Sequence, residues 1–253
     1  MTILKDCAEA ESPFHVEGAA RRGRFIVTCD HATNRVPPEI GTLGLPDADM
    51  ARHIAYDIGA LGVARWLGEL LEAPVISSNF SRLVIDPNRG EDDPTLIMQL
   101  YDGSIIPANK RLNEAERQAR LSAFYRPYDA ILAAAMAAQP DAVLVSIHSF
   151  TPQLNGKPRR PWEVGILHAH DARFSRPLIE ELKTNQEITV GVNEPYVGHL
   201  PGDAVDRHAL RSGRHNTLIE LRNDLITSEA GQRSWAELLR PPLEAALKFI
   251  DAE

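Results

Sequence analysis

The chain of 253 residues has few cysteines and no long hydrophobic run. Its two cysteines, Cys7 and Cys29, cannot form the disulfide framework of a small secreted protein. No stretch approaches the roughly 20 apolar residues that a membrane-spanning helix needs. Residues 1–14 also lack the basic start and apolar run of a secretory signal. We therefore expect a protein of the reducing cytoplasm without a membrane segment.

Positive charge is scarce as well, because 27 lysines and arginines stand against 35 aspartates and glutamates, a net charge of -8. This balance argues against a general binder of nucleic acid or of an anionic membrane. An anionic ligand would need a local group of arginines. The remaining composition, 43% hydrophobic and 25% charged, is that of a globular protein with a sizeable core.

Several common catalytic motifs are missing. The sequence has no Gly-x-Ser-x-Gly nucleophile elbow, no phosphate loop ending in Gly-Lys-Ser/Thr, no His-Glu-x-x-His and no Cys-x-x-Cys. These absences exclude the enzyme and redox classes that depend on those motifs.

Short apolar segments alternate with longer helical patterns along the chain. The expected strands are residues 25–29, 75–77, 82–85, 142–147, 164–167 and 217–221. The expected helices are residues 47–72, 113–139 (broken or kinked at Pro127), 174–185 and 228–250. This alternation predicts a single α/β domain over residues 1–253, with a mixed, mostly parallel sheet flanked by helices. We expect residues 1–22 to be loosely ordered, and residues 191–213 to form a long functional loop.

Three of the expected strands carry residues that could form a metal site. His31 and His148 follow two strands, and Glu220 interrupts an apolar one. Two histidines and a carboxylate provide the ligands and the general base that a catalytic zinc site needs. The alternative is structural: each histidine is an ordinary hydrogen-bonded residue, and Glu220 forms a buried ion pair with Arg222 or another arginine.

Two groups of arginines could bind carboxylates. Arg82 and Arg89 lie close to Asn88 in one turn-rich segment, where a substrate carboxylate could be held by two parallel hydrogen bonds. Arg211 and Arg214 flank a glycine just before the Glu220 strand and could hold a second carboxylate. The alternative for each group is a solvated surface turn. His168 and His170 could also bind metal, but they rank below His31 and His148.

Four blocks of the sequence, in this order, resemble the N-formylglutamate amidohydrolases: CDHATNRVP (29–37), SRLVIDPNR (81–89), SIHSF (146–150) and IELRND (219–224). The resemblance covers residues 25–225. That family is in turn similar to the zinc carboxypeptidase and aspartoacylase group, which implies a zinc-exopeptidase-like fold.

The resemblance also implies roles for individual residues. His31 and His148 match the zinc-binding histidines, and Glu220 matches the general base. Arg82 matches the arginine that polarises the scissile carbonyl. Asn88 and Arg89 match the pair that grips the substrate carboxylate.

One position departs from the wider group. Where that group has a glutamate ligand three residues after the first histidine, this chain has Asn34. The third metal ligand is therefore Asn34 itself or a nearby carboxylate, Asp30 or Asp57.

We thus expect one zinc ion per chain and a metal-dependent amidohydrolase that cleaves the N-acyl (N-formyl) amide of an acidic amino acid such as N-formylglutamate. Its partner would be a small molecule rather than a nucleic acid or a membrane. One alternative is a broader N-acyl amino acid deacylase or a small-peptide carboxypeptidase. Another is a non-catalytic carboxylate-binding protein on the same fold. The sequence leaves the acyl group, the loaded metal and the oligomeric state open.

Overall fold

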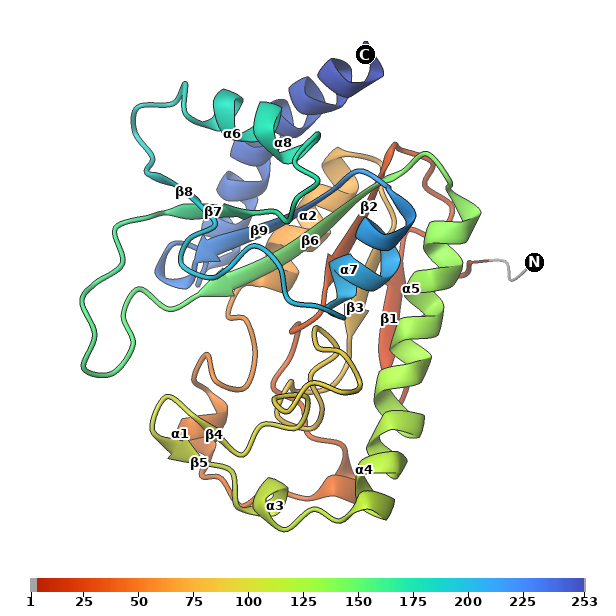
Figure 1. The fold of residues 1–253 in the computed structure, drawn as a ribbon, viewed down its shortest axis with the longest axis vertical. Helices are drawn as coiled ribbons and strands as arrows, with labels where there is room; N and C mark the ends of the chain where they lie inside the picture. Colours follow the sequence, from red (N-terminus) through yellow and green to blue (C-terminus); the bar gives the residue numbers. More distant parts are fainter. Residues whose placement is uncertain (1–3, 253) are drawn as a thin grey trace.

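A seven-stranded sheet runs through the centre of the structure, a computed structural model that describes residues 4–252 (Figure 1). The strands lie side by side in the order β1-β3-β2-β6-β9-β7-β8. Their bounds are β1 (Phe14–Glu17), β2 (Phe25–Cys29), β3 (Val75–Ser78), β6 (Val143–Phe150), β7 (Val164–Leu167), β8 (Val190–Val192) and β9 (Asn216–Arg222). The short strands β4 (Leu100–Tyr101) and β5 (Ser104–Ile105) form a separate hairpin.

The four central strands β3, β2, β6 and β9 are parallel to one another. The edge strand β1 is antiparallel to β3, and β7 is antiparallel to β9 while β8 runs parallel to β7. The predicted α/β fold with a mixed, mostly parallel sheet is therefore confirmed. Because parallel strands share one carboxyl edge, side chains at the ends of β2, β6 and β9 meet there.

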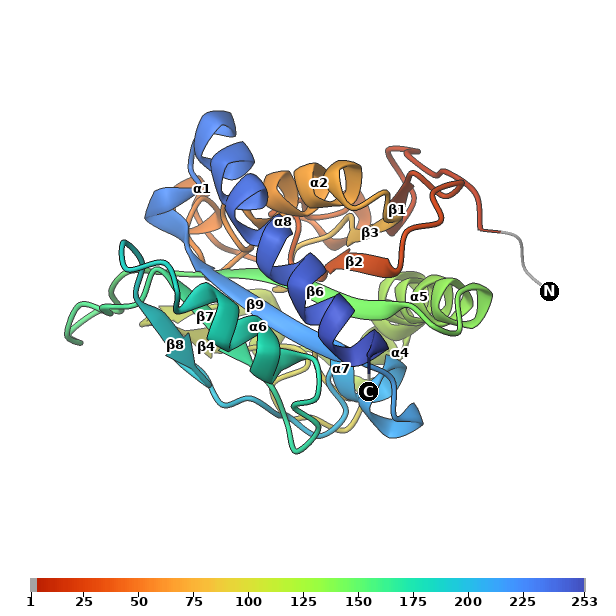
Figure 2. The same cartoon turned by 90° about the horizontal axis from the view of Figure 1, so that it is seen from above.

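Helices cover both faces of this sheet (Figure 2). One face is covered by α2 (Ala60–Leu70), α6 (Ser175–Leu182) and α8 (Glu229–Asp251), and the other by α5 (Arg126–Ala138) and α7 (Ala204–His208). Helix α4 (Glu114–Arg120) continues into α5 through a π-helical turn at Leu121–Tyr125, just before Pro127. The remaining short helices are α1 (Asp47–Met50) and α3 (Pro107–Lys110), with 3₁₀ turns at Pro38–Ile40, Leu210–Ser212 and Asn223–Leu225.

Strand β2 is buried on both faces, which explains why four of its five residues are apolar. Phe25, Val27 and Cys29 pack into the core beneath α2 and α8, whereas Ile26 packs into the core on the α5 side. Successive side chains of a strand point to opposite faces, so a strand between two helical layers must be apolar on both. No helix in the described part of the chain has the length and hydrophobicity needed to cross a bilayer.

The predicted helix over residues 47–72 is wrong in its middle. Helix α1 ends at Met50 and α2 begins at Ala60, and residues 51–59 form a series of turns. Gly59 adopts a left-handed conformation (φ +80°), and the Asp57 amide donates to the His31 carbonyl at 2.9 Å. The spacing of apolar residues is compatible with one continuous helix, but these tertiary contacts interrupt it.

The predicted strand over residues 82–85 is also wrong. This segment consists of turns, with the Val84 amide bonded to the Ser81 carbonyl at 2.9 Å. Its side chains Leu83, Val84 and Ile85 are nevertheless fully buried in the core on the α5 side. A short apolar run therefore indicated burial correctly but not the backbone conformation.

Two further segments are more regular than expected. Strand β1 lies within residues 1–22 and pairs with β3, and Cys7 forms a bridge to Val16. The loop predicted over residues 191–213 contains α7 and a 3₁₀ turn. Residues 1–3 and 253 of the predicted domain lie outside the described residues.

Gly59 offers a test of the turn that follows Asp57. A Cβ at Gly59 would lie 2.1 Å from the Ile226 carbonyl oxygen, whereas Gly103, with a similar φ of +84°, has no neighbour within 4 Å. We expect Gly59→Ala to lower the free energy of unfolding by at least ~3 kcal/mol and Gly103→Ala by about 1 kcal/mol. Chemical denaturation measures both. Equal losses would contradict close packing of this turn against Ile226.

Candidate functional site

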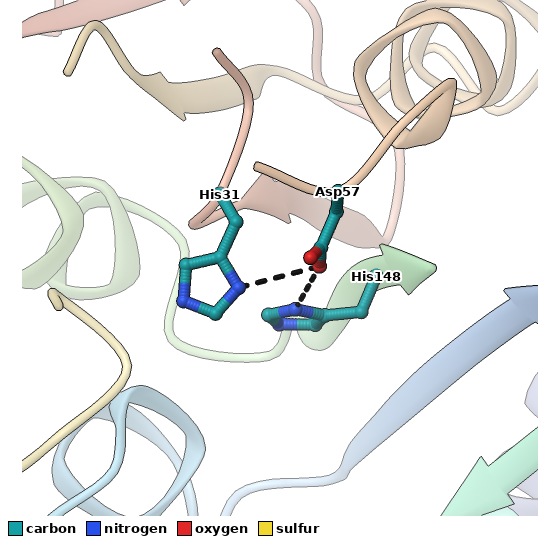
Figure 3. A group of neighbouring side chains, drawn as sticks. All are labelled: His31, Asp57 and His148. Carbon is teal, nitrogen blue, oxygen red and sulfur yellow. Dashed lines mark hydrogen bonds and ion pairs between the residues drawn. The ribbon is translucent and has the colours of Figure 1, made fainter. Parts of the chain in front are cut away.

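Two histidines and an aspartate meet at the carboxyl edge of the sheet (Figure 3). His31 follows β2, His148 lies in β6, and Asp57 lies in the turn before α2. The Nδ1 atoms of His31 and His148 lie 3.3 and 2.8 Å from Asp57 Oδ2. All three residues are about 2% exposed. One ligand atom from each residue lies within 4.8 Å of the others.

The second nitrogen of His31 is held by another carboxylate. His31 Nε2 lies 2.7 Å from Asp86 Oδ1, and Asp86 also accepts hydrogen bonds from Arg82 Nη2 at 2.8 Å and from the Asn88 amide at 2.9 Å. Asp86 is completely buried. The His31 ring is thus fixed from both sides, with Nδ1 directed toward Asp57.

His148 is held in the same way. Its Nε2 atom lies 3.0 Å from Ser146 Oγ and 3.4 Å from Asp30 Oδ2, and Asp30 also accepts a hydrogen bond from the Tyr128 hydroxyl. Histidines that bind metals commonly place their second nitrogen against a carboxylate or another acceptor in this manner, which fixes ring orientation.

Charge is concentrated in this cluster. Burial alone would raise the pKa of Asp57, but His31 and His148 outweigh it and hold that pKa well below its usual value. Burial likewise opposes protonation of His148, but Asp30 and Asp57 raise its pKa well above normal. An ionised carboxylate between two fixed imidazoles matches the donor set of a catalytic zinc site, which uses three protein ligands and keeps one position open. The residues therefore fit a metal ion.

A cavity of about 380 Å³ opens beside the cluster, and Glu220 projects into it. Glu220 in β9 stands opposite His148 in β6 and is 6% exposed. Its Oε2 atom has no hydrogen-bond partner among residues 4–252. Burial raises the pKa of Glu220 to about 8. Arg222, the expected structural partner, pairs instead with Glu163 and Asp224 at 3.0 and 2.8 Å.

Three residues of the 81–89 block also line the cavity: Arg82, Asn88 and Arg89. Arg82 is fixed by its ion pair with Asp86, and its buried Nε atom has no partner in the described chain. The Asn88 side chain accepts a hydrogen bond from the Ala204 amide at 3.1 Å. Arg89 donates from Nη1 to the Asn88 carbonyl at 2.7 Å. The turn-rich segment of residues 82–89 thus delivers three ligand-capable side chains to one cavity.

A family model described as N-formylglutamate amidohydrolase matches residues 23–227, which span the whole cluster and the cavity. The chain belongs to this family. The predicted family is therefore confirmed, and with it membership of a family of hydrolases. Comparison with curated proteins gave no match.

Two solved structures resemble the chain closely. A gene product from Agrobacterium tumefaciens is 37% identical, with a TM-score of 0.90, covering 96% of this chain and 97% of its own. An N-formylglutamate amidohydrolase from Ralstonia eutropha is 21% identical, with a TM-score of 0.73, covering 96% of this chain and 100% of its own. At that lower identity the Ralstonia structure shows a shared fold.

The structure does not bring Asn34 to the cluster. Its side chain is exposed, and Nδ2 donates to the Met50 carbonyl at 2.9 Å. Asp57 and Asp30 were the other candidates for the third ligand position. Asp57 contacts the Nδ1 atoms of both histidines, whereas Asp30 contacts only the Nε2 atom of His148. The spacing from His31 favoured Asn34, but the chain turns away from the sheet edge before that residue.

Arg211 and Arg214 do not line the cavity either. Arg211 pairs with Asp206 at 2.8 Å, and 61% of its side chain is exposed. Arg214 donates to the Met136 and Gln139 carbonyls at the end of α5. The structure therefore does not bring these two arginines to the cavity, because nearby acceptors of the protein itself bind both guanidinium groups. His168 and His170 also lie outside this cavity.

Sequence reasoning missed several residues of the cavity, including His53, Tyr101 and Tyr196. His53 Nδ1 lies 3.5 Å from Asp57 Oδ1, and burial lowers the pKa of His53 to about 4. Residues 51–59 were expected to be helical, so the spacing gave no reason to place His53 beside the His31–Asp57–His148 cluster.

The competing ligands Asp57 and Asn34 can be separated by metal content. We expect the purified protein to hold about one zinc per chain. Asp57→Asn should lose most of this metal, because a neutral amide replaces the ionised carboxylate between the histidines, while Asn34→Ala should keep it. Elemental analysis after dialysis measures both variants. Retention by Asp57→Asn together with loss from Asn34→Ala would reverse the assignment.

Proposed function

We propose that the chain is a metal-dependent amidohydrolase that cleaves the N-acyl (N-formyl) amide of an acidic amino acid such as N-formylglutamate. Family membership supports the reaction class. The observation that carries the proposal is the buried carboxylate of Glu220, whose unpartnered Oε2 atom shares one cavity with the His31–Asp57–His148 cluster. A purely structural glutamate in an apolar strand would have a hydrogen-bond or ion-pair partner.

His31, Asp57 and His148 would hold the metal. A bound zinc ion would supply Lewis acidity, which lowers the pKa of water and polarises a carbonyl. Asp86 and Asp30 would keep the two imidazole rings in place through their second nitrogens.

Glu220 would act as the general base. Its Oε2 atom would take the proton of the attacking water and then pass it to the nitrogen of the leaving amino acid. A pKa of about 8 lies near neutral pH, where a group can both accept and return a proton. The position of Glu220 beside His148 directs this carboxylate toward the metal-binding cluster.

Arg82 would stabilise the negative charge that develops on the carbonyl oxygen. Its guanidinium is buried and held by Asp86 at 2.8 Å, so it needs no reorganisation during the reaction. A fixed donor of this kind can contribute ~3 kcal/mol to the transition state.

Asn88 and Arg89 would bind the α-carboxylate of the substrate. Asn88 is held in place by the Ala204 amide, and Arg89 contacts Asn88 and Thr95 but pairs with no carboxylate in the described part of the chain. The cavity of about 380 Å³ suits a small molecule, since ligand pockets typically measure about 300–1,000 Å³. A cytoplasmic location stays a prediction from the sequence.

The rival functions differ in what this cavity should do. A neutral Asn34 ligand would bind a metal weakly and so favoured a non-catalytic carboxylate-binding protein. This argument is weaker now, because the ionisable Asp57 lies with the two histidines instead. A broader deacylase or a small-peptide carboxypeptidase would use the same catalytic residues. Either enzyme would differ only in which substrate side chains its cavity binds.

Glu220→Gln tests the assigned base. It keeps the shape of the side chain but removes its ability to accept a proton, so turnover of N-formylglutamate should fall at least ~100-fold. Zinc content and melting temperature should not decrease. Glu187→Gln makes the same chemical change at an exposed position of the loop before β8 and should leave turnover unchanged. Full activity in Glu220→Gln would remove the glutamate from the mechanism.

A further inference from the structure

Arg211 and Arg214 lie outside the cavity, so neither provides a cation for the side-chain carboxylate of an acidic substrate. Another arginine lies close to the cavity. Arg160, in the loop between β6 and β7, contacts Tyr196, which lines the cavity. Among the described residues no carboxylate lies within ion-pair distance of its guanidinium, whereas the adjacent Arg159 pairs with Asp224 at 3.0 Å. A partly buried cation without a counter-ion is unusual in a chain of net charge -8.

Arg160 is held in a fixed position beside the cavity. Its guanidinium carbon lies 5.0 Å from the centre of the Tyr196 ring and 5.5 Å from that of Phe150. Nη1 donates to the Thr151 carbonyl at 2.9 Å and lies 3.4 Å from the Tyr196 hydroxyl. Tyr196 itself lines the cavity. Arginine stacked on aromatic rings loses little conformational freedom when it binds an anion.

The charge of Arg160 acts on Glu220, the proposed general base. Burial raises the pKa of Glu220, and Arg160 is among the cations that act against this rise. Burial also raises the pKa of the Tyr196 hydroxyl well above its usual value, so this group stays protonated and can donate a hydrogen bond. A cation and a donor therefore lie together at the side of the cavity formed by residues 195–198.

We propose that Arg160, together with the Tyr196 hydroxyl, binds the side-chain carboxylate of the substrate and so determines the preference for acidic N-acyl amino acids. This inference rests on the proposed function, and what it adds is the residue pair that recognises the second carboxylate. Arg89 would bind the α-carboxylate and Arg160 the distal one. Arg89 lines the cavity and Arg160 contacts Tyr196, which lines it, and neither arginine has a carboxylate partner within residues 4–252.

The test compares kcat/KM for N-formylglutamate and for N-formylglutamine, which have the same shape but differ in side-chain charge. The wild-type protein should prefer N-formylglutamate by at least ~10-fold, since a hydrogen bond to a charged group contributes about that much or more. Arg160→Gln should remove this preference by lowering the value for N-formylglutamate alone. Arg159→Gln makes the same change at the exposed neighbour and should keep the preference.

Two results would overturn the inference. An unchanged preference in Arg160→Gln would mean that Arg160 does not read the carboxylate. An equal loss for both substrates would mean that Arg160 only supports the structure of its loop.

A binding experiment separates failure of this inference from failure of the proposed function. Calorimetry with glutarate and its monoamide needs no turnover. Wild-type protein should bind glutarate at least ~10-fold more tightly than the monoamide, and Arg160→Gln should abolish the difference. If neither formyl compound is hydrolysed but this pattern appears, the hydrolase function is wrong and the dicarboxylate site stands. Equal binding of the two ligands to the wild-type protein would refute the site whatever the activity.

Discussion

The buried carboxylate of Asp57 between the two imidazole rings is the interaction on which the site depends. Burying charged groups is expensive unless they are paired, and here each histidine is held between Asp57 and a second carboxylate. Three separate parts of the chain must converge to make these contacts: the end of β2, the middle of β6 and the turn before α2. The parallel centre of the sheet brings the first two together, and the interruption between α1 and α2 supplies the third.

Charges of opposite sign occupy different parts of the site. Asp30, Asp57 and Asp86 contact the two histidines, where they favour a cation. Arg82 and Arg89 line the cavity and Arg160 contacts Tyr196 at its side, where they favour an anion. Glu220 stands opposite His148 and also lines the cavity. A substrate with an amide near the His31–Asp57–His148 cluster and carboxylates toward the arginines would fit this separation, although the chain as a whole is acidic.

The sequence predicted those site residues whose position depends on buried strands. The apolar runs that became β2, β6 and β9 are unambiguous, and they place His31, His148 and Glu220 at one sheet edge. Asp57 could not be singled out, because the apolar spacing of Ile54 and Ile58 continues across a break that is made by contacts with distant segments.

For the arginines, nearness in sequence was a poor guide to their position in the folded chain. Arg211 and Arg214 are close to the Glu220 strand in sequence, yet Asp206 and the carbonyls at the end of α5 bind them in space. Arg160 lies in a loop without any periodic pattern, and only the tertiary fold stacks it on Tyr196. Which charges are already paired is a property of the folded chain, so Arg160 could not be singled out from the sequence alone.

Metal-dependent hydrolysis at the His31–Asp57–His148 cluster is the central claim, and a zinc titration of chelator-treated protein tests it most directly. The metal-free protein should remain folded and hydrolyse N-formylglutamate at less than ~1% of the loaded rate, because water is then left without a Lewis acid. Activity should rise linearly with added zinc and stop rising at about one equivalent per chain. Full hydrolysis by protein that elemental analysis finds free of metal would contradict the account.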